Sequence, residues 1–250
     1  MRTVAVILSA LVLGLAMGPA GASSPGLARD MAALDRAYIP ALALTSQANV
    51  LLSVKAMAIL VSQWQVFKSK YAGYIVADAL WQADLVYVDE QIHKADAIVR
   101  TGEHLVDAHE TLEGIRLRLL ETRRRIGLEY YVDYLTEFHG PMEEIVLAAK
   151  DKTPATLIDT DVARIAQTLP EAWRTWLLVV HAPLDNEVFE LSAAKLAQRQ
   201  QALQAGTEIL HALDQAVTDN SKEDIIKNAV TLKVNFAKLF MIFGDFDSLK

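Results

Sequence analysis

The sequence has no cysteine among its 250 residues and little glycine (11) or proline (7). Without cysteine the chain has no disulfide, thiolate metal site, iron–sulfur cluster, thiol nucleophile or covalently attached c-type haem. Few glycines and prolines leave few residues that break helices. The signatures GxGxxG, GxxxxGK[ST], GxSxG and HExxH are also missing. Their absence removes the common nucleotide-binding, hydrolase and zinc-protease motifs.

Positive charge is in the minority, because 24 Lys and Arg face 31 Asp and Glu, for a net charge of −7. A general nucleic-acid binder carries a clustered basic face, so we expect no nucleic-acid partner. The dense basic run consists of Arg116, Arg118, Arg123, Arg124 and Arg125 and ends before Gly127. Cations in a last turn followed by glycine are typical of a helix C-terminus. We favour that interpretation over a binding site for an anionic partner or a lipid headgroup.

The first 22 residues have the pattern of a secretory signal peptide. Arg2 gives a positive start, residues 4–17 form an apolar run, and Ala20-Gly21-Ala22 offers a small-residue cleavage pattern. The run of 14 residues is shorter than the roughly 20 that a spanning helix needs. We therefore predict cleavage after Ala22, with a permanent anchor as the alternative. The mature chain is expected to be periplasmic or secreted, with no stable membrane span.

Helical periodicity extends over almost all of the remaining chain, and no strand alternation stands out. Apolar residues recur at helical spacing over residues 49–71, 78–100, 105–119, 128–146, 161–169, 171–181, 191–217 and 222–243. Short connections between these segments favour antiparallel neighbours. The predicted fold class is all-α: an antiparallel helical bundle with a four-helix-bundle-like core and additional C-terminal helices.

The clearest signals for a boundary between helices lie at residues 150–161. There Asp151-Lys152-Thr153 precedes Pro154 and offers a helix N-cap. We predict an N-terminal bundle portion at 23–152 and a C-terminal helical portion at 153–250 packed on it. Pro40 is expected to kink or interrupt its helix. Internal repeats are weak, because the aromatic residues around Phe67 and around Phe240 do not share a spacing. A duplication is therefore not established.

The one group of residues that suggests a functional site is a pair of His-x-x-x-Glu patterns on consecutive predicted helices. His109 precedes Glu113 by four residues, and His139 precedes Glu143 by four. Four residues are just over one turn, so each pair shares a helix face. If the helices pack antiparallel around Gly127, Glu113 and His139 match in height to within about 3 Å, whereas the two histidines differ by roughly 9 Å. We expect the four side chains to form a slanted seam.

Imidazole and carboxylate ligands suit Fe, Zn, Mn or Cu. The sequence therefore predicts a transition-metal-binding protein for storage, delivery or sensing, with these four residues as ligands and no catalytic residue assigned. In the alternative, both histidines lie at the edge of the apolar stripe, and the helices bind a protein or a small molecule without metal. Pro141 would bend the helix beside His139 and open a ligand site. Acid–base catalysis and the oligomeric state are left open.

The layout resembles, in architecture, exported four-helix bundles such as the b-type cytochromes and the cytochrome c′-like proteins. The resemblance implies a bundle fold. Because the chain has no Cys-x-x-Cys-His, it implies at most a non-covalently bound haem b. Such folds host many functions, so the resemblance carries over no site residue.

Overall fold

The computed structural model describes residues 25–74 and 78–250, and the predicted signal peptide lies outside them. Within this part of the chain there is no strand, and the all-α prediction is confirmed. The helices are α1 (Pro25–Ser46), α2 (Val50–Tyr71), α3 (Trp81–Thr101), α4 (Leu105–Arg125), α5 (Tyr131–Ala149), α6 (Asp159–His181), α7 (Asn186–Phe189), α8 (Ala193–Thr218), α9 (Lys222–Met241) and the 3₁₀ helix η1 (Asp247–Leu249).

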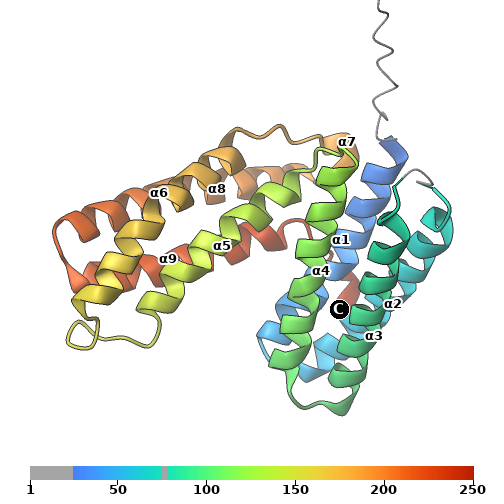
Figure 1. Cartoon of the computed structure of the whole chain (residues 1–250), viewed down its shortest axis with the longest axis horizontal. Coiled ribbons are helices and arrows are strands. Elements are labelled where there is room, and N and C mark those ends of the chain that lie inside the picture. The colour runs from blue at the N-terminus through green and yellow to red at the C-terminus, as the bar shows by residue number, and fades with distance from the viewer. Residues whose placement is uncertain (1–24, 75–77) are drawn as a thin grey trace, which may run out of the picture.

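The helices form two arms that meet at an angle (Figure 1). The first arm is a four-helix bundle in which α1 packs on α2 and α4, and α3 packs on the same two helices. The second arm is a bundle in which α5 packs on α6 and α9, and α8 packs on the same two helices. The predicted division after residue 152 falls between α5 and α6, inside this second arm. The loop from α4 to α5 joins the arms.

The arms also meet in a reciprocal way. The first helix of each arm contacts the last helix of the other, because α1 packs on α9 and α4 packs on α5. Reciprocal contacts of this kind are expected of two units related by an approximate two-fold axis. The short α7 packs against α1, and η1 brings the C-terminus onto α2 (Figure 1).

Corresponding helices also share apolar spacings. Leu60, Trp64 and Phe67 of α2 have the same spacing as Leu169, Trp173 and Trp176 of α6. In the third helix of each arm, Leu85 and Ile92 correspond in spacing to Leu203 and Leu210, and all four are buried. Each arm also begins with a helix that contains a proline, Pro40 in α1 and Pro141 in α5. The two arms therefore share the same order of helix contacts and several apolar spacings.

The predicted stripe on α4 is confirmed in full, because all five of its apolar residues are buried: Leu105, Ala108, Leu112, Ile115 and Leu119. On α2, Leu60 and Trp64 are fully buried, whereas Ile59 is exposed and lies outside the core. Leu80 also proves to be exposed, at the N-cap of α3.

The predicted helix break at one proline is wrong. α6 continues through Pro170, so the two segments predicted at 161–169 and 171–181 are one helix. α1 contains Pro40 without an interruption, which leaves the predicted kink as the remaining possibility. A proline removes one backbone hydrogen bond, and burial of the surrounding apolar face offsets that loss. Gly102 does end a helix, with φ of 74° at the C-cap of α3. That left-handed conformation favours glycine.

One helix of the described chain, α2, is long and apolar enough by length and composition to cross a membrane. The core helix of a soluble bundle passes the same test. In the bundle α2 buries Met57, Leu60 and Trp64 between its neighbours, and the Trp64 indole N–H donates to Asp89 Oδ1 of α3 at 2.8 Å. These contacts explain only part of its apolar composition, because 33% of the apolar window is buried and Leu51, Val54 and Val66 are exposed.

Candidate functional site

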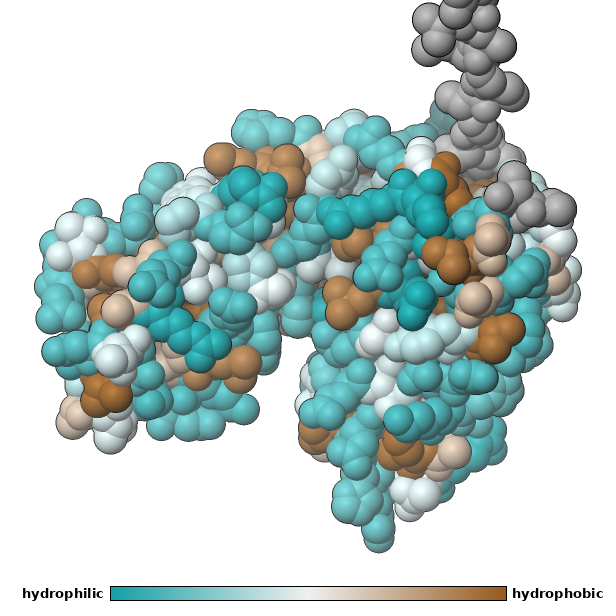
Figure 2. All heavy atoms as spheres, viewed as in Figure 1, coloured by the Kyte–Doolittle hydropathy of each residue, from teal (hydrophilic) through white to brown (hydrophobic). Residues whose placement is uncertain are grey.

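A cleft lies between the two arms of the described chain, with a volume of about 670 Å³. Figure 2 shows the surface deeply indented where the arms diverge. Helices α1 and α4 of the first arm form one wall, and α5 and α9 of the second arm form the other. The apolar lining residues are Leu42, Ala43, Val106, Met142, Phe236, Ala237, Phe240 and Met241, and the polar ones are Ser46, Gln47, His109, Glu110, Glu113, Arg116, His139, Glu143, Lys150 and Lys233.

All four residues of the predicted seam line this cleft. Glu113 lies at its centre, with Oε1 3.7 Å from His109 Nε2 and 4.0 Å from His139 Nε2. Glu143 is next along the seam, with Oε2 also 4.0 Å from His139 Nε2. The height match between Glu113 and His139 inferred from helical rise agrees with this placement. No pair among the four is within hydrogen-bond distance, so each is positioned by other groups.

Arg116 is a positioning group that was assigned to the basic run and not predicted as a site residue. Its Nη2 donates to Glu113 Oε2 at 2.7 Å and to His139 Nδ1 at 2.9 Å. The side chain is only 4% exposed, and its Nε is buried without a hydrogen-bond partner in the structure described. A buried guanidinium is stabilised only when its neighbours accept its N–H groups. The signal was present in the sequence, because Arg116 follows Glu113 by three residues on α4.

The hydrogen bond from Arg116 determines where His139 carries its proton. A guanidinium only donates, so Nδ1 of His139 accepts and the neutral ring has its proton on Nε2. Burial is the largest cause that lowers the pKa of His139, and together with the positive charges of Arg116 and Lys233 it brings the value to about 2. His139 is therefore a neutral residue with an N–H directed toward the carboxylates of Glu113 and Glu143.

His109 has the opposite arrangement. Its Nδ1 lies 3.0 Å from the carbonyl oxygen of Leu42 on α1. A carbonyl only accepts, so Nδ1 donates, and Nε2 faces the cleft. That nitrogen lies 3.7 Å from Glu113 Oε1, beyond hydrogen-bond distance.

The second wall supplies a cation and an aromatic ring. Lys233 Nζ of α9 lies 3.2 Å from both carboxylate oxygens of Glu143. The Phe236 ring lies 5.3 Å from the His139 ring, centroid to centroid. Neither residue was predicted as a site residue, because both come from a helix 90 or more positions away in the sequence. Only the meeting of α5 and α9 brings them to the seam.

The predicted metal ligands share a cleft without forming a compact cluster. Within the described residues, no group of three or more His, Asp or Glu side chains is arranged to hold a metal ion. The proton on His139 Nε2 is on the nitrogen that would have to bind the metal. The Arg116 guanidinium would also lie beside that metal ion. The metal site therefore stays a prediction, with His109 and Glu113 as the better-prepared pair.

A second buried polar cluster lies where the arms join. Arg123 of α4 donates to both carboxylate oxygens of Asp133 on α5, with Nε at 3.0 and 2.9 Å. The same guanidinium lies 4.5 Å from the centroid of the Tyr130 ring. The Tyr130 hydroxyl donates to Asp35 Oδ2 of α1 at 2.7 Å. Burial raises the pKa of Asp35 to about 6, although Arg123 acts in the opposite direction.

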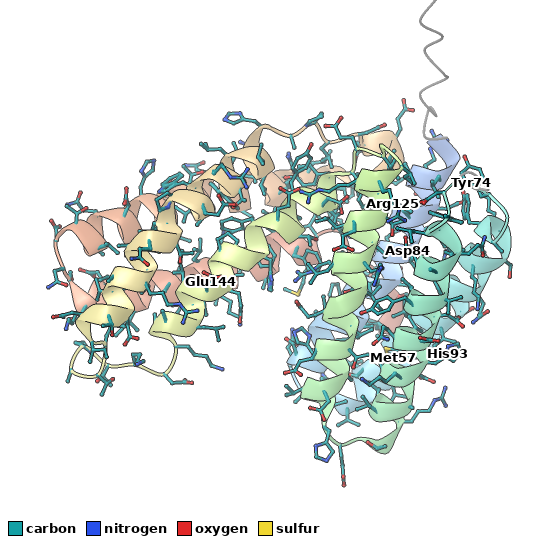
Figure 3. All side chains as sticks on the ribbon, in the orientation of Figure 1. Met57, Tyr74, Asp84, His93, Arg125 and Glu144 are labelled. Atoms are coloured by element: carbon teal, nitrogen blue, oxygen red, sulfur yellow. The ribbon has the colours of Figure 1, made fainter. Side chains whose placement is uncertain are left out.

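The remaining arginines of the basic run are held in ion pairs. Arg125 pairs with Asp78 and Asp84, Arg118 pairs with Asp84, and Arg124 pairs with Glu137. Figure 3 shows Asp84 and Arg125 beside each other on α3 and α4. These pairs support the interpretation of the run as a helix terminus, because its charges are directed to neighbouring helices.

Comparison with known proteins adds no assignment. No protein-family model matches the chain, and neither the curated proteins nor the solved structures give a match. The chemistry of the cleft is therefore inferred from its own residues.

Proposed function

We propose that this chain is a non-enzymatic binding protein that takes a small organic molecule into the cleft between its arms. The observation that supports this most is the cleft itself, about 670 Å³ in volume and lined by both arms. Ligand pockets usually range from about 300 to 1,000 Å³ and combine an apolar lining with a few polar groups that orient the ligand. Here Phe236, Phe240 and Met142 form apolar walls beside the seam.

A neutral fluorescent probe tests this proposal. Nile red is expected to bind the mature chain with increased fluorescence. The substitution Ala237→Trp should weaken binding at least tenfold, because the indole would fill the cleft that Ala237 lines. Ala97→Trp is the matched control, because Ala97 is exposed on α3. Equal binding to both variants, or no binding to the unaltered chain, would overturn the proposal.

A transition metal is a second candidate, and the ring of His109 supports it. Histidine ligands commonly donate their other ring N–H to a backbone carbonyl, as His109 does to Leu42. Its free Nε2 lies 3.7 Å from Glu113 Oε1. Two ligands at about 2.1 Å from a tetrahedral metal are about 3.4 Å apart, so this pair needs little movement. Glu143 and His139 would complete the predicted set after His139 loses its bond to Arg116.

Elemental analysis of untagged protein tests the metal. We expect at least half an equivalent of Fe, Zn, Mn or Cu after titration and removal of excess metal. His109→Ala should abolish that uptake, whereas His93→Ala on the exposed face of α3 should not. Retention of less than a tenth of an equivalent by the unaltered chain would remove this candidate.

We also propose that the chain is exported, from the signal-peptide pattern of residues 1–22. N-terminal sequencing of the protein from the periplasmic or culture fraction should begin at Ser23. An intact Met1 in that fraction would favour a retained anchor. Recovery only from the cytoplasm would contradict export.

A further inference from the structure

The groups that reach the interior of the cleft differ in charge from those that lie behind it. The side chains of His109, Glu113 and Glu143 are each about a quarter exposed, at 27%, 25% and 28%. Arg116 is buried behind them at 4%, and Lys233 is half in solvent at 50%. A molecule in the cleft therefore meets carboxylates and imidazole before it meets Arg116, whereas Lys233 is accessible beside Glu143.

These interior groups are mostly hydrogen-bond acceptors. His109 Nε2 and Glu113 Oε1 face each other at 3.7 Å, too far apart for a direct hydrogen bond. Glu143 Oε2 continues the row, 4.0 Å from His139 Nε2, and accepts from Lys233 Nζ at 3.2 Å. A single donor nitrogen placed between His109 and Glu113 could reach both atoms at normal hydrogen-bond length, about 2.9 Å. The gap between these two atoms is therefore open to a donor on a molecule in the cleft.

The apolar part of the cleft lies next to this row. The Phe236 ring packs on His139 at 5.3 Å and stacks on Phe240 at 5.9 Å. Met142, fully buried, lies beneath on α5. The pattern is an acceptor row with an aromatic and aliphatic wall, which complements a molecule with one cationic donor and an apolar body. Aromatic faces also attract cations.

We propose that the cleft selects an amphipathic primary amine, with its ammonium group between His109 and Glu113 and its apolar body against Phe236 and Phe240. This inference rests on the proposed function. An ammonium group has three donors and no acceptor, so it satisfies the acceptor row without competing for Arg116. Glu113 is the central residue for the selection, because it is the one acceptor close to both histidines.

Straight-chain probes with matched lengths test the head group. The mature chain, dialysed against EDTA, is titrated calorimetrically with alkylamines, alkanoates and alkan-1-ols of four to eight carbons. We expect the amines to bind at least tenfold more tightly than the alkanoates and alcohols of equal length. Glu113→Gln should reduce amine affinity at least tenfold while leaving alcohol affinity within threefold, because it removes charge and keeps the shape.

The control is Glu121→Gln, which makes the same change at an exposed position of α4, two turns beyond Glu113. It should leave amine binding unchanged. Thermal unfolding of both variants shows whether they are folded. Tighter binding of alkanoates or alcohols than of amines would overturn the amine inference and leave the binding function standing. If no probe of any head group binds, both the inference and the proposed function fail.

Discussion

The acid that shares the buried cluster at the arm junction should make stability depend on pH. Asp35 has a pKa of about 6 in the folded chain against 3.8 as a free residue, mainly because it is buried. The folded state therefore holds this proton more tightly between pH 4 and 6. Stability from this group is gained as pH falls through 6 and is lost as pH rises. A difference of about two pKa units corresponds to about 3 kcal/mol.

Asp35→Asn tests that effect, because it removes the titration and keeps an oxygen that can accept from Tyr130. Urea unfolding at pH 5 and pH 8 gives the free energy of unfolding for both proteins. Relative to the variant, the unaltered chain should be less stable at pH 8 than at pH 5 by about 1.4 kcal/mol, because pH 5 lies about one unit below the folded pKa of Asp35. His139 is present in both proteins, so its contribution cancels. If the free energy of unfolding differs between the two proteins by the same amount at pH 5 and at pH 8, the prediction is wrong.

His139 should act in the opposite direction. Its pKa is about 2 when folded and 6.5 when free, mainly because burial disfavours the charged ring. The unfolded chain therefore takes up the proton first, and stability falls as pH drops below 6.5. The loss between pH 6.5 and 5 approaches about 2 kcal/mol.

His139→Asn should reduce that loss, because its side-chain oxygen can replace Nδ1 as the acceptor for Arg116. Thermal or urea unfolding from pH 7 to 5 measures it. Parallel curves for the variant and the unaltered chain would show that folding does not lower the pKa of His139, which would contradict the prediction.

Among whole helices, the contact between α8 and α6 has the least room. A Cβ atom added at Gly206 would lie 2.3 Å from Cζ2 of Trp176 and 3.0 Å from the Asn235 amide. Gly206→Ala would otherwise gain up to about 1 kcal/mol of helix propensity. We expect a net loss of about 1–3 kcal/mol in the free energy of unfolding, because overpacking a rigid ring costs more than the propensity gain.

The double variant Gly206→Ala, Trp176→Phe separates the two effects. Phenylalanine lacks the second ring that the new methyl group would meet. The alanine substitution should therefore cost less in the Trp176→Phe background than in the unaltered chain, as a double-mutant cycle measures. If the alanine substitution proves stabilising in the unaltered chain, the close approach of α6 and α8 is wrong.

The helices themselves were largely predictable from the sequence, because an amphipathic period is a local property. The α4 stripe and the break at Gly102 follow from spacing and from one left-handed residue. The helix break predicted at Pro170 was wrong. A rule based on local sequence counts the backbone hydrogen bond that proline removes, but it does not count the burial of Trp176 on the same helix. The helices α3 and α4 are consecutive in the sequence, as are α5 and α6. The antiparallel packing within each pair was therefore also predictable.

The candidate site was predictable in part, for the same reason. Glu113 and His139 lie on helices joined by one short turn, so helical rise alone placed them together. Lys233 and Phe236 come from α9, and no local pattern shows which helix closes the far wall. The correspondence between the arms was also missed, because it depends on apolar spacings shared by dissimilar residues, such as Phe67 with Trp176.

For the molecule as a whole, the Arg123–Asp133 pair holds the arms together where α4 passes into α5. Both side chains are buried, at 2% and 9% exposure. Arg123→Met would leave the Asp133 carboxylate without its cation, and breaking a buried pair in this way costs about 3–5 kcal/mol. We expect a loss of that size in urea unfolding.

Arg124→Met is the comparison, because Arg124 is 57% exposed and its pair with Glu137 is screened by water. That change should cost less than about 1 kcal/mol. Similar losses in the two variants would mean that the junction cluster contributes no more than a surface pair.

The reciprocal contacts between the arms have a consequence for evolution of the cleft. In a true homodimer the two walls would carry the same residues, and any substitution would appear twice. Joining both units in one polypeptide removes that constraint, so each wall can mutate alone. The cleft shows such divergence: α4 presents His109 and Glu113, whereas the matching helix α9 presents Lys233 and Phe236. A fused pair can thus recognise a ligand whose two ends differ, which a symmetric pair would meet with identical surfaces.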